Sequence, residues 1–262
     1  MSKSKGNVVN PWDHFNKEGT DAIRWYMTSQ SAPWNPMNFD PNGVRETYAK
    51  MFLTLWNVHK FHLDYAILDN FDYNKDFITV DKRNALDRWI LSRVSTVAEN
   101  YHNQYVSWEF HKAARELENF VINDLSNWYV RRSRRRLWDE ADSHDKQACQ
   151  FTLHEVLLTV SKLMAPVAPF MPDKIHFDLT GTSVHMADWP LGSDLVSKDL
   201  PPQDLDLENR MSIVRMLAET GRKIRVEAKR RQRLPCKEGW IVGGPDLSEF
   251  HSIIAEELNV EN

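Results

Sequence analysis

The sequence predicts a mainly α-helical protein built around a helical bundle, and three observations carry that prediction. Apolar residues recur every three to four positions over four stretches of about twenty residues or more, as they do on one face of an amphipathic helix. Prolines and glycines cluster between or after these stretches. The 262-residue chain is 42% hydrophobic and holds 10 Trp, 7 Tyr and 12 Phe, so it is expected to bury a substantial core instead of remaining disordered.

The first 41 residues are predicted to form a small connector. Prolines at positions 11, 33, 36 and 41 interrupt this stretch, and proline-containing dipeptides favour turns and loops. One short helix is expected over residues 21–29. We therefore assign residues 1–41 to the connector.

Four long helices are predicted to follow. Their apolar spacing places them at residues 43–68, 81–105, 107–137 and 145–164. The last helix is expected to end before Pro166, because proline cannot continue a helix. Long helices joined by short links pack as a bundle, so residues 42–200 are predicted to form one helical domain.

A smaller C-terminal region is predicted beyond the bundle. After a short helix over residues 173–179, prolines and glycines mark an irregular crossing, which we take as a domain boundary. A helix is expected over residues 205–232. The C-terminal region is therefore assigned to residues 201–262.

This region is predicted to be a truncated α/β tail. Trp240–Val242 is predicted to form a short strand, because aromatic and β-branched residues favour strands. Asp246 and Glu249, three residues apart, resemble a helix-start capping pair. A final helix is expected over residues 250–258.

Positive charge is concentrated in two segments of an otherwise acidic chain. Five arginines lie between Arg131 and Arg136, and seven basic residues accompany one acid between Arg222 and Arg233. The whole chain has a net charge of −4, so the residues outside these segments sum to −15. This distribution favours an anionic partner such as nucleic acid at two places. Solvated helix faces are the alternative interpretation.

Composition and spacing argue against several other classes of protein. Cys149 and Cys236 lie far apart in no CxxC pattern, and His59 and His62 lack further ligands, so neither a disulfide framework nor a metal site is indicated. No Ser-His-Asp arrangement or Gly-rich nucleotide loop is found. No run of about 18 apolar residues is present, so no membrane span is expected. A reducing, cytoplasmic compartment is expected.

The first seven residues, Met-Ser-Lys-Ser-Lys-Gly-Asn, are cationic and rich in hydroxyl groups, which suits a polyphosphate; a flexible tail is the alternative. With the segment 19–26, they resemble the class I aminoacyl-tRNA synthetases, whose Lys-Met-Ser-Lys-Ser signature they match except for its first lysine. The resemblance implies an ATP-binding loop formed by Ser2, Lys3 and Ser4. It also implies a catalytic role for Lys3, which aligns with the second lysine of the signature and would stabilise phosphate charge in the transition state.

An arginine run beside aromatic residues is the strongest chemical feature of the sequence. The segment 125–138 reads Leu-Ser-Asn-Trp-Tyr-Val-Arg-Arg-Ser-Arg-Arg-Arg-Leu-Trp. Guanidinium groups pair with phosphates and stack on unpaired bases, so such a patch suits RNA. The tRNA-binding candidates are Trp128, Arg131, Arg132, Arg134, Arg135 and Arg136. For Trp128, which continues the apolar stripe of its helix, packing in the core is the favoured alternative.

This helix resembles the corresponding helix of isoleucyl-tRNA synthetases, and the resemblance covers nearly the whole chain. Further matching segments include residues 54–57, 86–90, 164–166 and 256–260. The resemblance implies a tRNA-binding portion of an enzyme that attaches isoleucine to tRNA(Ile) with ATP and Mg²⁺. The nucleotide-binding sheet and the editing domain would lie upstream of Met1. The fragment is thus expected to be monomeric, to hold no cofactor and to be inactive alone.

Three alternatives remain open at the level of sequence. The chain could be a helical module that binds RNA or protein without amino-acid specificity. It could be the same region of a valyl-tRNA synthetase. The arginines could also serve ion pairs within the chain, because the rest of the sequence is strongly acidic.

Overall fold

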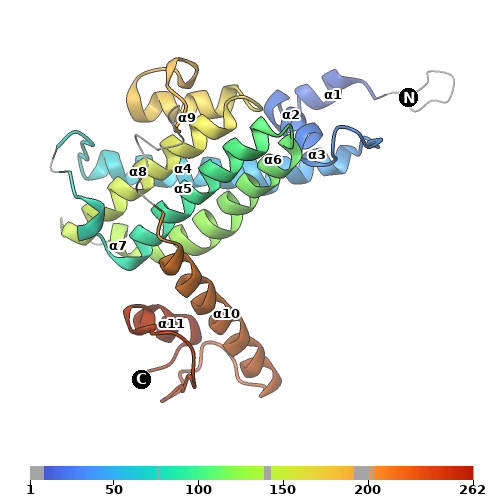
Figure 1. Ribbon diagram of the computed structural model, residues 1–262. Coiled ribbons are helices and arrows are strands. Elements are labelled where there is room, and N and C mark those ends of the chain that lie inside the picture. The colour runs from blue at the N-terminus through green and yellow to red at the C-terminus, as the bar shows by residue number, and fades with distance from the viewer. Residues whose placement is uncertain (1–8, 76, 139–142, 192–200, 202, 262) are drawn as a thin grey trace.

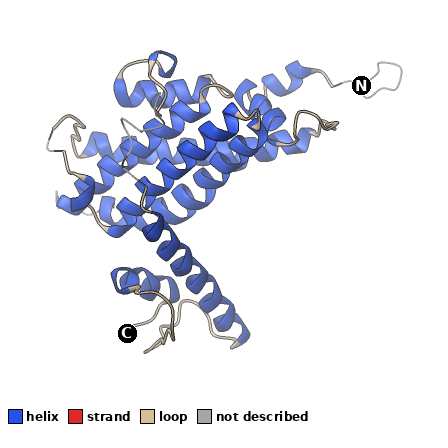
Figure 2. Cartoon of the chain, viewed as in Figure 1, coloured by secondary structure: helices blue, strands red, loops and turns tan. Residues whose placement is uncertain are grey.

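The computed structural model describes residues 9–75, 77–138, 143–191, 201 and 203–261. Helices dominate this part of the chain, and no strand occurs within it (Figure 2). The mainly α-helical bundle predicted from the apolar periodicity is confirmed. None of the described helices is both long and apolar enough to cross a lipid bilayer.

The first predicted bundle helix is a rod of three successive segments. These are α3 (Pro41–Thr47), the π-helical turn η2 (Tyr48–Phe52) and α4 (Leu53–Leu68). The N-terminus of the rod is capped by Asp40, whose side chain accepts the N–H of Asn42, and such a cap satisfies a backbone donor left free in the first turn.

The third predicted helix is likewise a continuous rod, which we call the arginine rod. It consists of α6 (Phe110–Asn119), the π-helical segment η4 (Phe120–Val130) and α7 (Arg131–Trp138). Two further helices, α5 (Ala85–Val106) and α8 (His144–Met164), complete the bundle (Figure 1). The arginine rod packs against both α4 and α5, and α8 packs against α4 and α5 as well.

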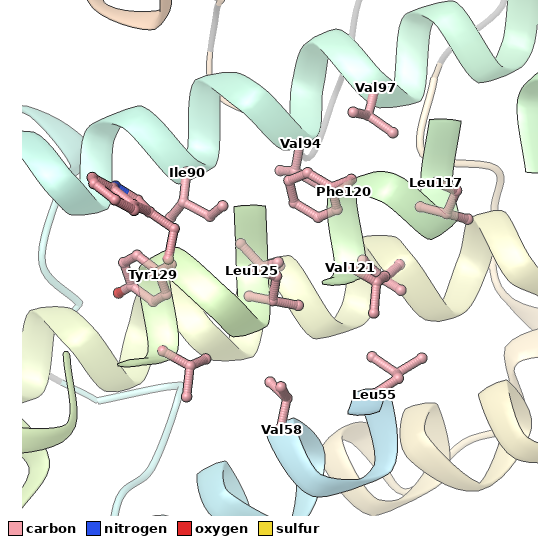
Figure 3. Close-up of a cluster of buried hydrophobic side chains, with 14 of the residues drawn as sticks. Leu55, Val58, Ile90, Val94, Val97, Leu117, Phe120, Val121, Leu125 and Tyr129 are labelled. Carbon is pink, nitrogen blue, oxygen red and sulfur yellow. The ribbon is translucent and has the colours of Figure 1, made fainter. Parts of the chain in front are cut away.

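Side chains from four elements fill the centre of the bundle (Figure 3). Leu55 of α4, Ile90 and Val94 of α5, and Leu125 of η4 are all fully buried. These residues belong to rows spaced three to four positions apart within their helices, so each helix turns one apolar stripe inward. The central packing therefore holds the arginine rod firmly against α5 and α4.

Two short helices of the N-terminal connector pack on one end of the bundle. They are α1 (Pro11–Phe15) and α2 (Thr20–Ser29), and only the second was predicted. Arg24 of α2 donates from Nε to the carbonyl oxygen of Val167 at 2.6 Å. Asp21 accepts the backbone N–H of Met171 at 2.7 Å, at the start of α9 (Phe170–Thr180).

The longest helix of the C-terminal region, α10 (Leu205–Glu227), starts against α5 and projects away from the bundle (Figure 1). It ends five residues before the predicted end at residue 232, and Lys229 then adopts a φ of 53°. Arg225 stabilises this ending, because its guanidinium donates to the carbonyl oxygens of Arg231 at 3.0 Å and Leu258 at 3.0 Å.

The last helix, α11 (His251–Leu258), packs against α10 after a short 3₁₀ turn, η6 (Ser248–Phe250). Gly221 of α10 permits this close approach, since a Cβ atom at that position would collide with the Leu258 side chain. The remaining 3₁₀ turns of the described chain are η3 (Val80–Lys82) and η5 (Val184–Met186).

The strand predicted at Trp240–Val242 is not formed, and this part of the prediction is corrected. Trp240 is 85% exposed and Val242 97% exposed, and among the described residues the segment has no neighbouring strand to pair with. A strand needs such a partner for its backbone N–H and C=O groups. In the described tail, β-type pairing is limited to an isolated parallel bridge between Cys236 and Val260.

The capping pair predicted before α11 is formed only in part. Asp246 accepts the backbone N–H of Ser248 at 2.9 Å, as a helix-start residue does. Glu249 instead forms ion pairs with Arg88 of α5, in the bundle, and with Arg210 of α10. Glu249 therefore ties the tail to the bundle and does not close a capping box.

Candidate nucleic-acid interface

The arginine rod changes its helical geometry where it approaches the C-terminal region. The segment Phe120–Val130 is π-helical over 11 residues. A π-helix bonds residue i to residue i+5, is usually limited to a single turn, and is frequent at functional sites. Its wider turn brings side chains four positions apart almost into line. The rod thus carries a straight polar row on the side that faces α10.

Trp128 lies beneath three arginines at the C-terminal end of this segment. It is 5% exposed, so it packs in the core as its apolar stripe favoured. The guanidinium carbons of Arg131, Arg132 and Arg215 lie 5.7, 5.6 and 5.4 Å from the Trp128 ring. A cation over an indole face is attracted by the ring quadrupole. Trp128 therefore helps to position the arginines and is covered by them.

Glu257 of α11 binds three arginines at once. One of its carboxylate oxygens accepts from Arg131 at 2.5 Å and from Arg132 at 2.6 Å, and the other accepts from Arg222 at 2.7 Å. Burial opposes ionisation of Glu257, but the hydrogen bonds and charge of Arg131, together with the charge of Arg132, outweigh it, so its pKa is lowered. This cluster of Glu257, Arg131, Arg132 and Arg222, which we call the Glu257 clamp, joins α11, α7 and α10.

Arg136 is engaged on the opposite side of α7. Its guanidinium contacts both carboxylate oxygens of Asp87 at 2.8 and 2.6 Å, and its Nε donates to Asp145 at 2.7 Å. Tyr129 also donates to Asp87, at 2.5 Å. Because the Asp87 side chain is fully buried, Arg136 serves mainly to neutralise that carboxylate. It is thus a structural residue of the bundle.

Arg134 and Arg135 have the opposite character. Both side chains are exposed, and within the described part of the chain neither forms an ion pair or hydrogen bond. Exposed arginines are the ones that can reach phosphate oxygens without first breaking a buried ion pair. The six sequence-predicted tRNA-binding residues therefore separate into exposed arginines (Arg134, Arg135), a half-exposed one (Arg131) and largely buried residues (Trp128, Arg132, Arg136).

A groove of about 630 Å³ opens between the arginine rod and α10, where α10 diverges from the bundle. Its lining residues come from both elements: Asn123, Asn127, Trp128, Arg131, Ser212, Arg215, Met216, Glu219 and Arg222. A second hollow of about 390 Å³ shares Asn123, Ser212 and Arg215 with the groove. We call the two together the trough.

Sequence reasoning missed several residues of the trough and of the Glu257 clamp beside it. Arg215 is isolated in the sequence, yet it donates to Asp124 at 2.5 Å and lies over Trp128. Glu257 is an ordinary acidic residue near the end of the chain. Its partners Arg131 and Arg132 are 126 and 125 positions away, and no local pattern indicates such a contact. The spacing of Asn123 and Asn127 is visible in the sequence but becomes meaningful only beside α10.

The other predicted site residues are distributed as follows. Ser2, Lys3 and Ser4 lie outside the described residues. In the second basic segment, Arg222 and Arg225 form hydrogen bonds with Glu257 and Leu258 of α11. Other basic residues of this segment are exposed: Lys229, Arg230, Arg231 and Arg233. Among the described residues, no three His, Cys, Asp or Glu side chains are arranged as a metal-ligand group.

The chemistry of this surface is that of a polyanion-binding site with polar selectivity. Arginines at the rim of the trough provide planar, permanently charged donors that suit phosphate groups. Amides and a hydroxyl inside the trough both donate and accept hydrogen bonds. The geometry therefore fits an anionic polymer that also carries hydrogen-bonding edges.

Comparison with known protein families gives a match over most of the bundle and α10. The family described as the anticodon-binding domain of tRNA ligase matches residues 87–239. This range includes the arginine rod and both walls of the trough.

Curated relatives match the whole chain. An isoleucine–tRNA ligase of Clostridium novyi is 39% identical and an isoleucine–tRNA ligase 2 of Bacillus cereus is 38% identical, each over 100% of this chain and 25% of the relative. An isoleucine–tRNA ligase of Porphyromonas gingivalis is 38% identical over 100% of this chain and 23% of its own. The chain thus spans about a quarter of the length of these relatives.

A solved structure shares the fold at low sequence identity. It is the LeuRS chain of a ternary complex of Agrobacterium radiobacter K84 agnB2 LeuRS, tRNA and LeuAMS. The TM-score is 0.54, the identity is 19%, and the match covers 79% of this chain and 23% of that one. The helical arrangement described above is therefore shared with a much longer protein.

Proposed function

The chain belongs to the family of anticodon-binding domains of tRNA ligases, and from this premise we propose that it is the tRNA-binding portion of an isoleucine–tRNA ligase. The observation that carries the proposal is the trough beside the arginine rod, which lies within the family match. Similarity to isoleucine–tRNA ligases over the full length of the chain supports isoleucine as the amino acid. The ligand of the trough would then be the anticodon arm of tRNA(Ile).

The complete enzyme would attach isoleucine to tRNA(Ile) using ATP and Mg²⁺. Ser2, Lys3 and Ser4 would belong to its ATP-binding loop, with Lys3 stabilising the charge that develops on the phosphates during adenylate formation. The helical bundle and the tail would contribute no bond-making step. Their role would be to hold the tRNA in the correct position.

The exposure of each arginine supports a division of roles at the interface. Arg134 and Arg135 are exposed and would contact phosphates directly. Arg131 is half-exposed at the mouth of the trough and would contact RNA while it remains paired with Glu257. Arg132, Arg136 and Trp128 are largely buried and would position these groups.

We also propose the division into residues 1–41, 42–200 and 201–262, supported by the point at which α10 leaves the bundle. We also propose a cytoplasmic location, which the two free cysteines support, because thiols stay reduced in that compartment. The proposal includes a monomeric chain without a membrane partner.

Binding of tRNA tests the proposal. Isoleucine tRNA and valine tRNA are each titrated in a filter-binding assay with the whole chain, at several salt concentrations. We expect isoleucine tRNA to bind more tightly, and we expect the logarithm of the affinity to fall linearly with the logarithm of salt. Equal binding of the two tRNAs would point to an RNA-binding module without amino-acid specificity. No binding at low salt, together with stability that depends on salt, would point to arginines that serve ion pairs within the chain.

A further inference from the structure

A row of asparagines runs along one face of the arginine rod, over its π-helical segment. Asn119, Asn123 and Asn127 are spaced by four residues, and Arg131 continues the row. The wider π-helical turn keeps such residues on one face. Asn123 donates from Nδ2 to Oδ1 of Asn119 at 2.7 Å, so these two neighbours in the row are in contact. The row runs along one wall of the trough.

The facing wall is the polar side of α10. Asn209 and Ser212 lie one turn apart on this helix and line the trough. Within the described part of the chain, the side chains of Asn127, Asn209 and Ser212 have no hydrogen-bond partner, and all three are exposed. Each of these groups can both donate and accept a hydrogen bond. They offer a ligand both kinds of contact.

The charges that surround the trough are largely compensated. The lining holds four arginines (Arg93, Arg131, Arg215 and Arg222) and three acids (Asp124, Glu208 and Glu219). Arg215 is paired with Asp124 at 2.5 Å, whereas Arg131 and Arg222 share the one carboxylate of Glu257. Glu219 is itself paired with Lys223 at 2.7 Å, so the lining carries only a small excess of positive charge. A channel that binds only a phosphate backbone is instead lined by an excess of uncompensated cations. The interior of the trough is therefore better suited to a neutral, planar, polar group than to a phosphate.

Unpaired nucleotide bases have these properties. In double-stranded RNA, base pairing occupies the Watson–Crick edges, whereas the bases of loops and bulges present donors and acceptors to the protein. Asparagine amides match such edges with paired hydrogen bonds. The groove volume of about 630 Å³ lies in the range of pockets that hold small organic ligands, roughly 300–1,000 Å³, so the groove is large enough for a base.

Resting on the proposed function as a tRNA-binding chain, we propose that the trough reads unpaired RNA bases, with Asn127 and Asn123 as specificity-determining residues, while the exposed arginines of α7 bind the flanking phosphates. Asn127 contacts the base with a free amide. Asn123, whose Nδ2 is engaged by Asn119, presents its Oδ1 as an acceptor. Sequence selectivity and phosphate affinity are then carried by different side chains.

The test uses the whole chain and three RNA probes. The first is a hairpin with the sequence of the anticodon arm of isoleucine tRNA, the second has the same stem with the loop of valine tRNA, and the third is a fully paired duplex of the stem. We expect the wild-type chain to prefer the first hairpin and to bind the duplex weakly. Asn127→Ala is expected to reduce the preference for the first loop over the second by about tenfold, because the base then loses an amide that makes two hydrogen bonds to it.

A matched control distinguishes base recognition from general damage. Asn103 is an exposed asparagine on α5, outside the trough, and Asn103→Ala should preserve the loop preference. For Asn127→Ala, thermal unfolding and the slope of log affinity against log salt should equal those of wild type, because no phosphate contact is removed. The slope separates a base contact from a phosphate contact.

Each outcome bears on the inference in a defined way. If the wild-type chain binds the first hairpin but Asn127→Ala and Asn123→Ala leave the loop preference intact, the inference is overturned and the proposed function stands. If the chain binds the duplex as tightly as the first hairpin, the inference is likewise overturned and the proposed function stands. If the wild-type chain binds neither hairpin at low salt, both the proposed function and this inference fail.

Discussion

Arg132 and Glu257 form a buried ion pair of 2.6 Å, with 6% and 3% of their side chains exposed, although they are 125 positions apart in the chain. Their contact fastens the last helix of the tail to the arginine rod. The carboxylate is shared with Arg131 and Arg222, so one acidic residue supports three cations that line or border the trough. Tail docking and the shape of the trough are therefore coupled.

Replacing Glu257 by Gln should destabilise the protein by about 3 kcal/mol, because removal of one partner leaves buried arginine charge uncompensated. Urea unfolding measures this loss as a lower midpoint. Glu256→Gln is the matched control: Glu256 is 62% exposed and also pairs with Arg132, so its loss should cost less than about 1 kcal/mol. Equal effects of the two substitutions would contradict the central role of Glu257.

Replacing Arg136 by Met should cost about 3–5 kcal/mol, because the Asp87 carboxylate is then buried without a cation. The double variant Asp87→Asn with Arg136→Met leaves no buried charge and should recover a large part of that loss. Arg135→Met, at an exposed position of the same helix, should change the free energy of unfolding by less than about 0.5 kcal/mol. Failure of the double variant to recover stability would show that the charge balance is not the cause.

Much of the fold was predictable because it follows from local periodicity. The helices around Leu55, Ile90 and Leu125 form where their apolar spacing placed them, since burial of one stripe decides each helix. The π-helical geometry of η4 has no signature in the sequence and depends on packing. The prediction of a strand at Trp240–Val242 was wrong, because a side-chain preference for strands does not supply a neighbouring strand to pair with.

The candidate site was predictable in its location but only partly in its residues. The run from Arg131 to Arg136 marked the helix that borders the trough, and Trp128 is buried, as its position on the apolar stripe favoured. Which arginines are exposed is decided by Asp87 and Glu257, two acids distant in the sequence. Helical spacing alone cannot identify such partners. Composition indicated the kind of surface, and tertiary contacts separate the exposed arginines from the paired ones.

Acid should destabilise the bundle through two buried histidines. Burial, together with the nearby charges of His154 and His59, lowers the pKa of His62 to about 3, and burial followed by the charge of His176 lowers that of His154 to about 4. In the unfolded chain both pKa values return to about 6.5. The unfolded state therefore binds protons first, so stability is retained above pH 6.5 and decreases as the pH falls towards 4.

The expected loss is roughly 2 kcal/mol for each of these histidines between pH 7 and pH 5. Urea unfolding at a series of pH values measures it. His154→Gln should remove about half of the pH dependence that the two histidines cause. His251→Gln, an exposed residue of α11, is the control and should leave the pH dependence as it is. An unaltered pH profile in His154→Gln would rule out this assignment.

Removal of Arg134 and Arg135 should weaken RNA binding without destabilising the fold. Both side chains are exposed and form no ion pair within the described chain, so the double substitution to Ala should leave the urea midpoint nearly unchanged. For every phosphate that is no longer bound, the slope of log affinity against log salt should fall by about 0.7 to 0.9. Filter binding of isoleucine tRNA between low and moderate salt measures this slope.

Arg132 should behave differently from Arg134 and Arg135. Arg132 is nearby in sequence, but it is held in the Glu257 clamp, so Arg132→Ala should lower stability and should affect RNA binding only through loss of α11 docking. A salt slope that falls in the Arg132 variant but not in the Arg134 and Arg135 variant would reverse the roles assigned to these residues. If both variants retain the wild-type slope, the phosphate contacts are made by other exposed cations, such as Arg131 or Lys229, Arg230, Arg231 and Arg233 beyond α10.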